Sequence, residues 1–259
     1  MDADEWRRYV TTYHDARPGI TERLFALAEA SPYTWLAEPL RGGPGPVLDL
    51  ACGSAPTRDL LPDTAWLGVD SSRGELGEAA RRGRGPLVRA RADALPVRAG
   101  SVGAVCAAMC LPVVTPLPRV LGEIRRVLRP GGRLAALVPA SSGLTVAGAA
   151  GWARVMGALR AVRQPWPNPD ARDGLAGLLR AAGFLVRSDE RQVFTLAVET
   201  PRAAGLLADA LYLPGLTARR AASAKRSLAR WARPGRLLPL PLRRIVAESP
   251  APHPGRAGS

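Results

Sequence analysis

The chain has 259 residues, of which 47% are hydrophobic and 22% charged, an ordinary composition for a globular protein of one large domain or one domain with an appended cap. The net charge is +14, and all but one of its 36 basic residues are arginine. Residues 214–259 hold ten basic residues against one acid, which leaves open an anionic partner such as RNA or a solvated basic face.

Cysteine and histidine usage excludes a structural zinc site. Only Cys52, Cys106 and Cys110 occur, without a CxxC pair and with two histidines in the whole chain. The opening residues lack the apolar stretch of a signal peptide, so we expect a cytoplasmic protein. Two uncharged runs, 99–118 and 134–153, contain internal proline and glycine, which favours buried strands over membrane spans.

The N-terminal part, residues 1–46, is predicted to form a helical cap and linker. Residues 4–40 suit two or three short helices, the first capped by Asp4, and 41–46 is rich in glycine and proline. Behind this linker, strands alternate with helices. The expected strands are 47–50, 65–70, 87–92, 101–109 and 133–138, and the expected helices are 55–61, 73–82 and 118–128. Such alternation predicts an α/β fold with a doubly wound, mostly parallel sheet.

Beyond residue 138 the pattern is more helical. Helices are expected at 144–162, 170–182, 201–212 and 217–232, and strands at 184–186, 192–198 and 242–247. Helix 217–232 carries apolar residues on one face and arginines on the other, as a surface helix or an RNA-facing helix would. We therefore expect one domain over 47–248, helical insertions at 141–170 and 200–238, and a disordered tail at 249–259.

The most informative pattern is VLDLACGSA at 47–55, followed by LGVDSS at 67–72. A small-residue turn after a strand allows a ligand to approach the backbone, and an acid at the tip of the next strand can accept hydrogen bonds from a ribose. Asp70 follows Asp49 by 21 residues, as this arrangement requires. The turn keeps only Gly53 of a GxGxxG pattern, which counts against NAD or FAD.

Four segments in order resemble the class I S-adenosylmethionine-dependent methyltransferases. Asp49-Leu50-Ala51-Cys52-Gly53-Ser54-Ala55 is similar to their first motif, D-x-(G/A)-C-G-x-G. Residues 68–72 resemble the second motif, 91–96 the third, and 121–139 the helix, turn and strand that follow the fourth strand. The resemblance implies a seven-stranded, Rossmann-like sheet and S-adenosyl-L-methionine as cofactor. This ligand has no phosphates, so it tolerates alanine where a phosphate cradle needs glycine.

The same resemblance assigns the cofactor site. The implied cofactor-binding residues are Asp49, Ala51, Cys52, Gly53, Asp70, Ser71, Asp93, Ala94 and Cys110. Among the departures, Gly103 stands where the family often has aspartate, and Ala55 replaces the third glycine of the first motif. Cys110 is interpreted as a lining residue because the Pro-Cys pair of cytosine methylases is absent. No metal is expected.

Residues for the acceptor are harder to assign. His14 is a candidate general base, although a surface or helix-packing histidine is the favoured interpretation. Tyr13, Arg17 and Trp152 are candidate substrate-lining residues, while the aromatic residues of the insertions also suit the core of a cap. We expect methyl transfer by direct displacement to a small molecule, without a membrane partner. An RNA methyltransferase and a non-catalytic cofactor-binding module stay as alternatives, and an NAD-dependent oxidoreductase is the least favoured.

Overall fold

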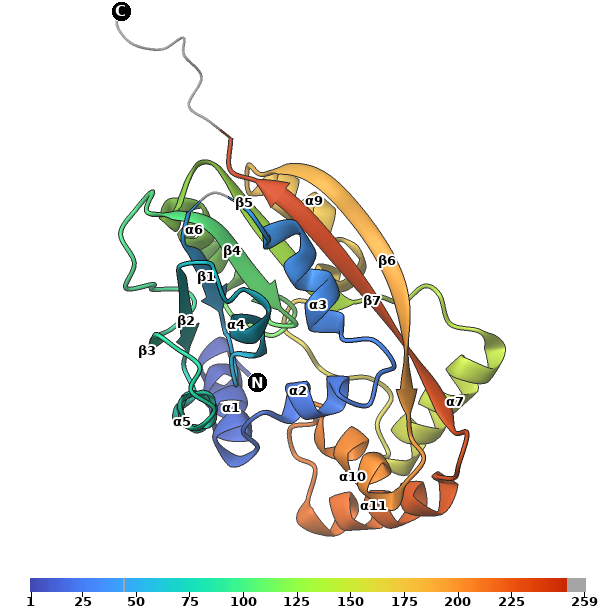
Figure 1. The fold of residues 1–259 in the computed structure, drawn as a ribbon. Coiled ribbons are helices and arrows are strands. Elements are labelled where there is room, and N and C mark those ends of the chain that lie inside the picture. The colour runs from blue at the N-terminus through green and yellow to red at the C-terminus, as the bar shows by residue number, and fades with distance from the viewer. Residues whose placement is uncertain (44, 251–259) are drawn as a thin grey trace, which may run out of the picture.

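One mixed sheet of seven strands organises the computed structural model, which describes residues 1–43 and 45–250. The strands are β1 (Val47–Leu50), β2 (Trp66–Asp70), β3 (Leu87–Arg89), β4 (Val102–Ala108), β5 (Leu128–Pro139), β6 (Leu185–Ala197) and β7 (Leu237–Glu248). Their order is β3-β2-β1-β4-β5-β7-β6, with β7 antiparallel to both of its neighbours and the other pairs parallel (Figure 1). The predicted doubly wound α/β sheet is confirmed, and its order reverses between β1 and β4.

Helices cover both faces of this sheet. They are α1 (Ala3–Ala16), α2 (Ile20–Phe25), α3 (Pro32–Ala37), the 3-10 turn η1 (Glu38–Leu40), α4 (Pro56–Leu60), α5 (Arg73–Arg81), α6 (Leu117–Val127), α7 (Val146–Ala158), α8 (Asp170–Asp173), α9 (Leu175–Ala181), α10 (Pro201–Asp209) and α11 (Ala218–Trp231). In Figure 1, β6 and β7 continue past the other strands towards α7, α10 and α11. No helix among the described residues is long and apolar enough to cross a bilayer.

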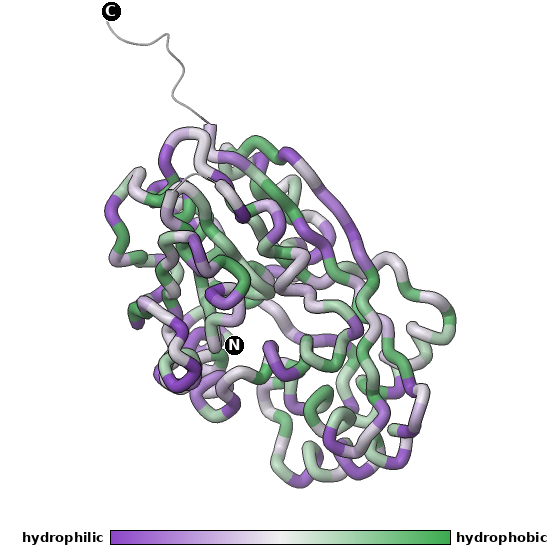
Figure 2. Tube along the Cα trace, in the orientation of Figure 1, coloured by the Kyte–Doolittle hydropathy of each residue, from purple (hydrophilic) through white to green (hydrophobic). Residues whose placement is uncertain are grey.

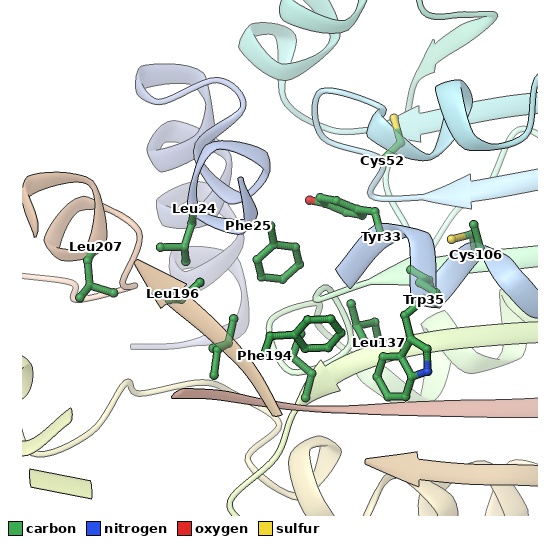
Figure 3. Packing of buried hydrophobic residues seen from close by; sticks show 14 of the residues in the cluster. Leu24, Phe25, Tyr33, Trp35, Cys52, Cys106, Leu137, Phe194, Leu196 and Leu207 are labelled. Atoms are coloured by element: carbon green, nitrogen blue, oxygen red, sulfur yellow. The ribbon is translucent and has the colours of Figure 1, made fainter. Parts of the chain in front are cut away.

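Alternate residues of the strands pack into two separate cores. In β5, Ala135 and Leu137 belong to the core that includes α3, α7, α10 and α11, whereas Leu134 and Ala136 belong to the core formed with α6, α8 and α9. This alternation is what a strand buried on both faces produces. Figure 3 shows side chains of the first core, where α2, α3 and β6 meet.

The cap of the first helix lies two residues earlier than predicted. Asp2, not Asp4, is the N-cap, because its side chain accepts from the Glu5 amide at 2.8 Å while Glu5 accepts from the Asp2 amide. The predicted helix 170–182 is also interrupted. Gly174 separates α8 from α9 and closes the last turn of α8 through its bond to the Asp170 carbonyl.

The edge strand β6 is longer than the sequence indicated. Two strand segments were expected around a polar stretch, yet β6 runs unbroken except for a register shift between Val186 and Ser188. Acids in that stretch pair with buried arginines of β7: Asp189 with Arg243 and Glu190 with Arg244. The polar residues between the two predicted segments therefore belong to the edge strand, and they are visible along β6 in Figure 2.

Strand β7 begins at Leu237, five residues before the predicted start. Pro239 and Pro241 pair with β6, while β5 joins β7 only from Leu242 onward. Proline is tolerated at these positions because one side of the strand has no neighbouring ladder there. At the other end, Ser249 exchanges backbone hydrogen bonds of 2.8 Å with Gly131 and Gly132, so ordered structure reaches into the predicted tail. Residues 251–259 of that tail lie outside the described residues.

The close packing around Gly68 in β2 predicts that a larger side chain at this position destabilises the protein. A Cβ on Gly68 would lie 2.4 Å from the Trp66 ring, 2.9 Å from the Cys52 sulfur and 3.0 Å from Leu87. Gly68→Ala should therefore lower the free energy of unfolding by about 1–3 kcal/mol in urea titrations. Gly77→Ala is the matched control, because nothing lies within 4 Å of its Cβ position in α5. That variant should be stabilised by about 0.5–1 kcal/mol, and equal stability changes for the two variants would contradict this packing.

Candidate active site

A cavity of about 670 Å³ lies at the carboxyl ends of β1, β2 and β4. Helix α1 contributes to its wall, and its cavity-lining residues include Asp4, Arg7, Thr11 and His14, which recur at helical spacing. The strand order reverses between β1 and β4. In doubly wound folds, ligands bind at the carboxyl ends of the strands beside such a reversal, and the cavity lies at this position.

Most of the residues predicted for the cofactor line this cavity. They are Asp49, Ala51, Cys52, Gly53, Asp70, Ser71, Asp93 and Cys110, together with the candidate base His14. The structure does not place Ala94, Tyr13, Arg17 or Trp152 among the lining residues. The Ala94 amide donates to the Arg91 carbonyl at 3.2 Å, so it is used within its own turn.

The turn after β1 adopts an unusual backbone conformation. Ala51, Gly53 and Ala55 have φ values of 52°, 55° and 57°, in the left-handed region. For the two alanines this region costs roughly 1 kcal/mol each, so the turn must be held by its surroundings. The Cys52 amide donates to the Val69 carbonyl at 3.1 Å. The Gly53 amide donates to Asp70 Oδ2 at 2.9 Å.

A second set of bonds fixes this turn from outside the sheet. Ser54 donates its hydroxyl to Glu22 of α2 at 2.6 Å, and Arg84 donates to the Ser54 carbonyl at 2.8 Å. Arg84 also bridges Glu22 and Asp59. The strained turn is thus tied to three neighbouring elements.

Asp70 connects the turns that follow β1 and β2. Its Oδ2 accepts from the Gly53 amide, and its Oδ1 accepts from the Ser72 amide at 2.8 Å. Burial raises the pKa of this carboxyl even though both amides oppose the shift. A carboxylate has about four lone-pair sites, so Asp70 keeps acceptor capacity for a ligand.

Asp49 is the least satisfied group of the cavity. Thr57 donates its hydroxyl to Oδ2, but Oδ1 is buried and has no hydrogen-bond partner among the described residues. Burial, with Asp70 as a like charge nearby, raises the pKa of Asp49 to about 7. A buried acceptor without a partner costs free energy, so this oxygen suits a donor supplied by a ligand.

Asp93 differs because it already has a cationic partner. Arg91 donates to both carboxylate oxygens, at 2.8 and 2.6 Å. Bonding to Arg91 lowers the pKa of Asp93, so this carboxylate is ionised at neutral pH. Its position beside Asp70 on the cavity wall follows from the pairing of β2 with β3.

The cysteines at the cavity are buried and in their thiol form. Burial raises the pKa of Cys52 and Cys110 above the ordinary thiol value, with Asp49 adding to the effect. A protonated thiol is a poor nucleophile, so both side chains are suited to lining the wall.

The candidate substrate-lining residues Tyr13, Arg17 and Trp152 pack outside the cavity. The Tyr13 hydroxyl donates to the Asp209 carbonyl, and Arg17 stacks over the Tyr13 ring at 4.8 Å. Trp152 Nε1 donates to the Pro239 carbonyl at 2.7 Å, within the core of the helical insertion. Trp231 packs in the same core.

Lining residues that the sequence analysis did not name include Tyr33, Thr57, Glu75 and Met109. Glu75 is 2% exposed and accepts from the Gly19 amide at 2.7 Å and from His14 Nδ1 at 2.7 Å. In the sequence it stands three residues after the helix cap Ser72, a spacing typical of an exposed capping box. Tyr33 belongs to no recognisable sequence motif. Figure 3 shows its ring between Phe25 and Cys52.

Part of the chain is similar to known proteins. Residues 48–136 match the family described as methyltransferase domain. Malonyl-acyl-carrier protein O-methyltransferase of Alcanivorax borkumensis is 42% identical over 106 residues, which cover 38% of this chain and 36% of the relative. The chain therefore aligns with about a third of that protein.

Solved structures support the fold. A methyltransferase from Bacillus halodurans has a TM-score of 0.56 and 14% identity, covering 86% of this chain and all of its own. A methyltransferase from Thermotoga maritima has a TM-score of 0.56 and 15% identity, covering 92% and 99%. The cyclase SpnF has a TM-score of 0.57 and 21% identity, covering 85% and 80%.

These matches show the fold and one matching segment. The chain has the fold of the class I S-adenosylmethionine-dependent methyltransferases, and residues 48–136 are similar to the family described as methyltransferase domain. Because a cyclase shares the fold, the reaction has to be argued from the site itself.

The raised pKa of Asp49 predicts a measurable stability change. Its folded-state pKa of about 7 exceeds the ordinary 3.8, so the folded protein binds more protons than the unfolded chain between these values. Stability from this group therefore falls as the pH rises from 4 to 7. Asp49→Asn should raise the free energy of unfolding of the ligand-free protein by about 1–3 kcal/mol at pH 8, and this gain should shrink towards pH 5.

Urea titrations at several pH values provide the measurement. Asp63→Asn is the control, because Asp63 is exposed and lies outside the cavity. A loss of stability in Asp49→Asn at pH 8 would show that the ionised carboxylate is stabilised in the ligand-free protein.

Proposed function

We propose that the protein is a methyltransferase that uses S-adenosyl-L-methionine and acts on a small-molecule acceptor. The observation that carries this proposal is the placement of Asp49, Asp70 and Asp93 around one cavity at neighbouring strand ends. Three carboxylates without a phosphate-binding glycine cradle suit a cationic nucleoside ligand better than a dinucleotide.

Each carboxylate has a role in this proposal. Asp49 offers its unpartnered Oδ1 to the cofactor's ammonium group, Asp70 its remaining lone pairs to the ribose hydroxyls, and Asp93 an acceptor to the adenine amine. A bound cationic group would also offset the repulsion between Asp49 and Asp70 that the ligand-free site contains.

The cofactor supplies an activated methyl group, which leaves the protein the tasks of alignment and desolvation. Helix α1 is suited to both, because it contacts the strand ends and the helix after β2. Asp15 accepts from the Ser72 hydroxyl and the Gly74 amide at 2.7 and 2.9 Å, and Trp6 donates to the Val113 carbonyl at 2.6 Å. A wall held in this way keeps water from the reacting atoms.

Cavity size and wall favour a small acceptor. About 670 Å³ lies within the range of small-molecule sites. The relative named for a malonyl group on acyl-carrier protein also has a small acceptor group, there attached to a carrier protein. We also propose a cytoplasmic location, since the three cysteines are free thiols.

The positions of the basic side chains give less support to the alternative of an RNA methyltransferase. Among the basic residues of 214–259, Arg243 and Arg244 are buried in ion pairs, and Lys225 pairs with Asp209 at 2.6 Å. The exposed arginines of α11 lie outside the cavity lining. An RNA methyltransferase would instead show RNA binding that weakens steeply with salt.

Calorimetry with S-adenosyl-L-methionine, S-adenosylhomocysteine and NAD tests the proposal. We expect binding of the first two and none of NAD. Asp70→Asn should weaken S-adenosyl-L-methionine binding by about 10–100-fold, because hydrogen bonds to a charged group contribute about 1.5–3 kcal/mol. Asp63→Asn should bind as the wild type does, and circular dichroism confirms folding of both variants. Binding of NAD alone, or unchanged affinity in Asp70→Asn, would refute the cofactor proposal.

A further inference from the structure

Three side chains from distant parts of the chain form a hydrogen-bonded chain at the cavity. Glu75 Oε1 lies 2.7 Å from His14 Nδ1, and His14 Nε2 lies 2.8 Å from the Tyr212 hydroxyl. The three residues come from α5, α1 and the segment after α10, and all three line the cavity. This chain is called the Glu75–His14–Tyr212 relay below.

The partners of His14 fix the direction of the relay. Glu75 also accepts from the Gly19 amide at 2.7 Å, so its carboxylate is held in place and acts as an acceptor. Nδ1 of His14 therefore carries the proton that Glu75 accepts, and Nε2 is left as the acceptor for the Tyr212 hydroxyl. The tyrosine can then take a proton from a third group as it passes its own to the imidazole.

The ring of Tyr212 is positioned by packing. It lies 4.8 Å from the Tyr13 ring and 6.4 Å from the Trp6 ring, and the Tyr212 amide donates to the Gln164 side chain at 2.7 Å. Burial raises the pKa of Tyr212, and the surrounding Tyr9, Tyr13, Glu75 and Asp70 raise it further. The hydroxyl thus stays protonated until the imidazole accepts its proton.

We propose that Tyr212 is a catalytic residue that deprotonates a hydroxyl-bearing acceptor, with His14 as the proton acceptor and Glu75 as a positioning residue. This inference rests on the proposed methyl transfer. As the acceptor oxygen forms its bond to the methyl carbon, the sulfur–carbon bond breaks and the sulfonium becomes a neutral thioether. The acceptor O–H proton moves to the Tyr212 oxygen, and the Tyr212 proton moves to His14 Nε2. The resulting imidazolium is paired with Glu75.

The relay indicates the chemical class of the acceptor. A carboxylate with a pKa of about 4 is already ionised at neutral pH and needs no base, whereas a phenol with a pKa of about 10 does. A relay aimed into the cavity is therefore suited to a phenolic or other neutral hydroxyl group. This differs from the malonyl carboxyl group named for the curated relative.

The same bonds also hold α1 to α5 and to the segment after α10. A structural role and a catalytic role of Tyr212 differ in what Tyr212→Phe does to acceptors of different acidity. A structural loss would lower all rates alike. A lost base would penalise only acceptors that arrive protonated.

The experiment measures transfer of labelled methyl groups to phenol and to 4-nitrophenol at pH 8, where 4-nitrophenol is largely ionised. Tyr212→Phe should lower the rate with phenol by about 100-fold or more and the rate with 4-nitrophenol by less than about tenfold. His14→Gln should give the same pattern. Tyr9→Phe is the matched control, since Tyr9 belongs to the same aromatic cluster but does not line the cavity. It should leave both rates near those of the wild type.

The outcomes separate this inference from the proposed function. Equal losses with the two phenols would overturn the catalytic role of Tyr212. So would transfer only to a carboxylate probe, S-malonyl-N-acetylcysteamine, or no transfer to either phenol by protein that binds the cofactor in calorimetry. Absence of cofactor binding would instead refute the proposed function itself.

Discussion

The site depends on the bonding of Asp70 to the two turns beside it. One oxygen holds the amide of Gly53, after β1, and the other holds the amide of Ser72, before α5. These bonds set the spacing of the turns and fix the left-handed conformation of Gly53. Because hydrogen bonds to a buried charge are stronger than those between neutral groups, this carboxylate contributes strongly to holding the turn, together with the bonds that join Ser54 to Glu22 and Arg84.

The central part of the fold was predictable because its signals are local. The strand, small-residue turn and following acid lie within 47–72, and their register follows from parallel pairing of β1 with β2. Most of the predicted cofactor residues therefore meet at one cavity. Ala94 lies outside the cavity lining, because its amide is bonded to the Arg91 carbonyl within its own turn, and no sequence pattern showed this bond.

Contacts between residues far apart in the chain could not be predicted from the sequence, for a different reason. His14 and Tyr212 are separated by 198 positions, and their contact depends on how β6 and β7 carry the insertion helices towards α1. Glu75 follows Ser72 by three residues, which is the spacing of an ordinary helix cap, so the sequence offered no reason to place this carboxylate at the cavity. Only the packing of α1 on α5 shows that this carboxylate faces His14 and Gly19.

The cavity is rich in acidic residues although the protein as a whole has a positive net charge. The chain carries +14, yet Glu22, Asp49, Asp70, Glu75 and Asp93 all line the cavity. Local potential in a buried site follows the nearby groups rather than the total charge, because low-dielectric walls limit screening. Arg84 pairs with Glu22 and Arg91 pairs with Asp93, whereas Asp49 keeps a buried oxygen that has no hydrogen-bond partner among the described residues. A cationic ligand would therefore be attracted to Asp49 even though the protein as a whole is strongly basic. This arrangement favours the proposed sulfonium cofactor over an anionic dinucleotide.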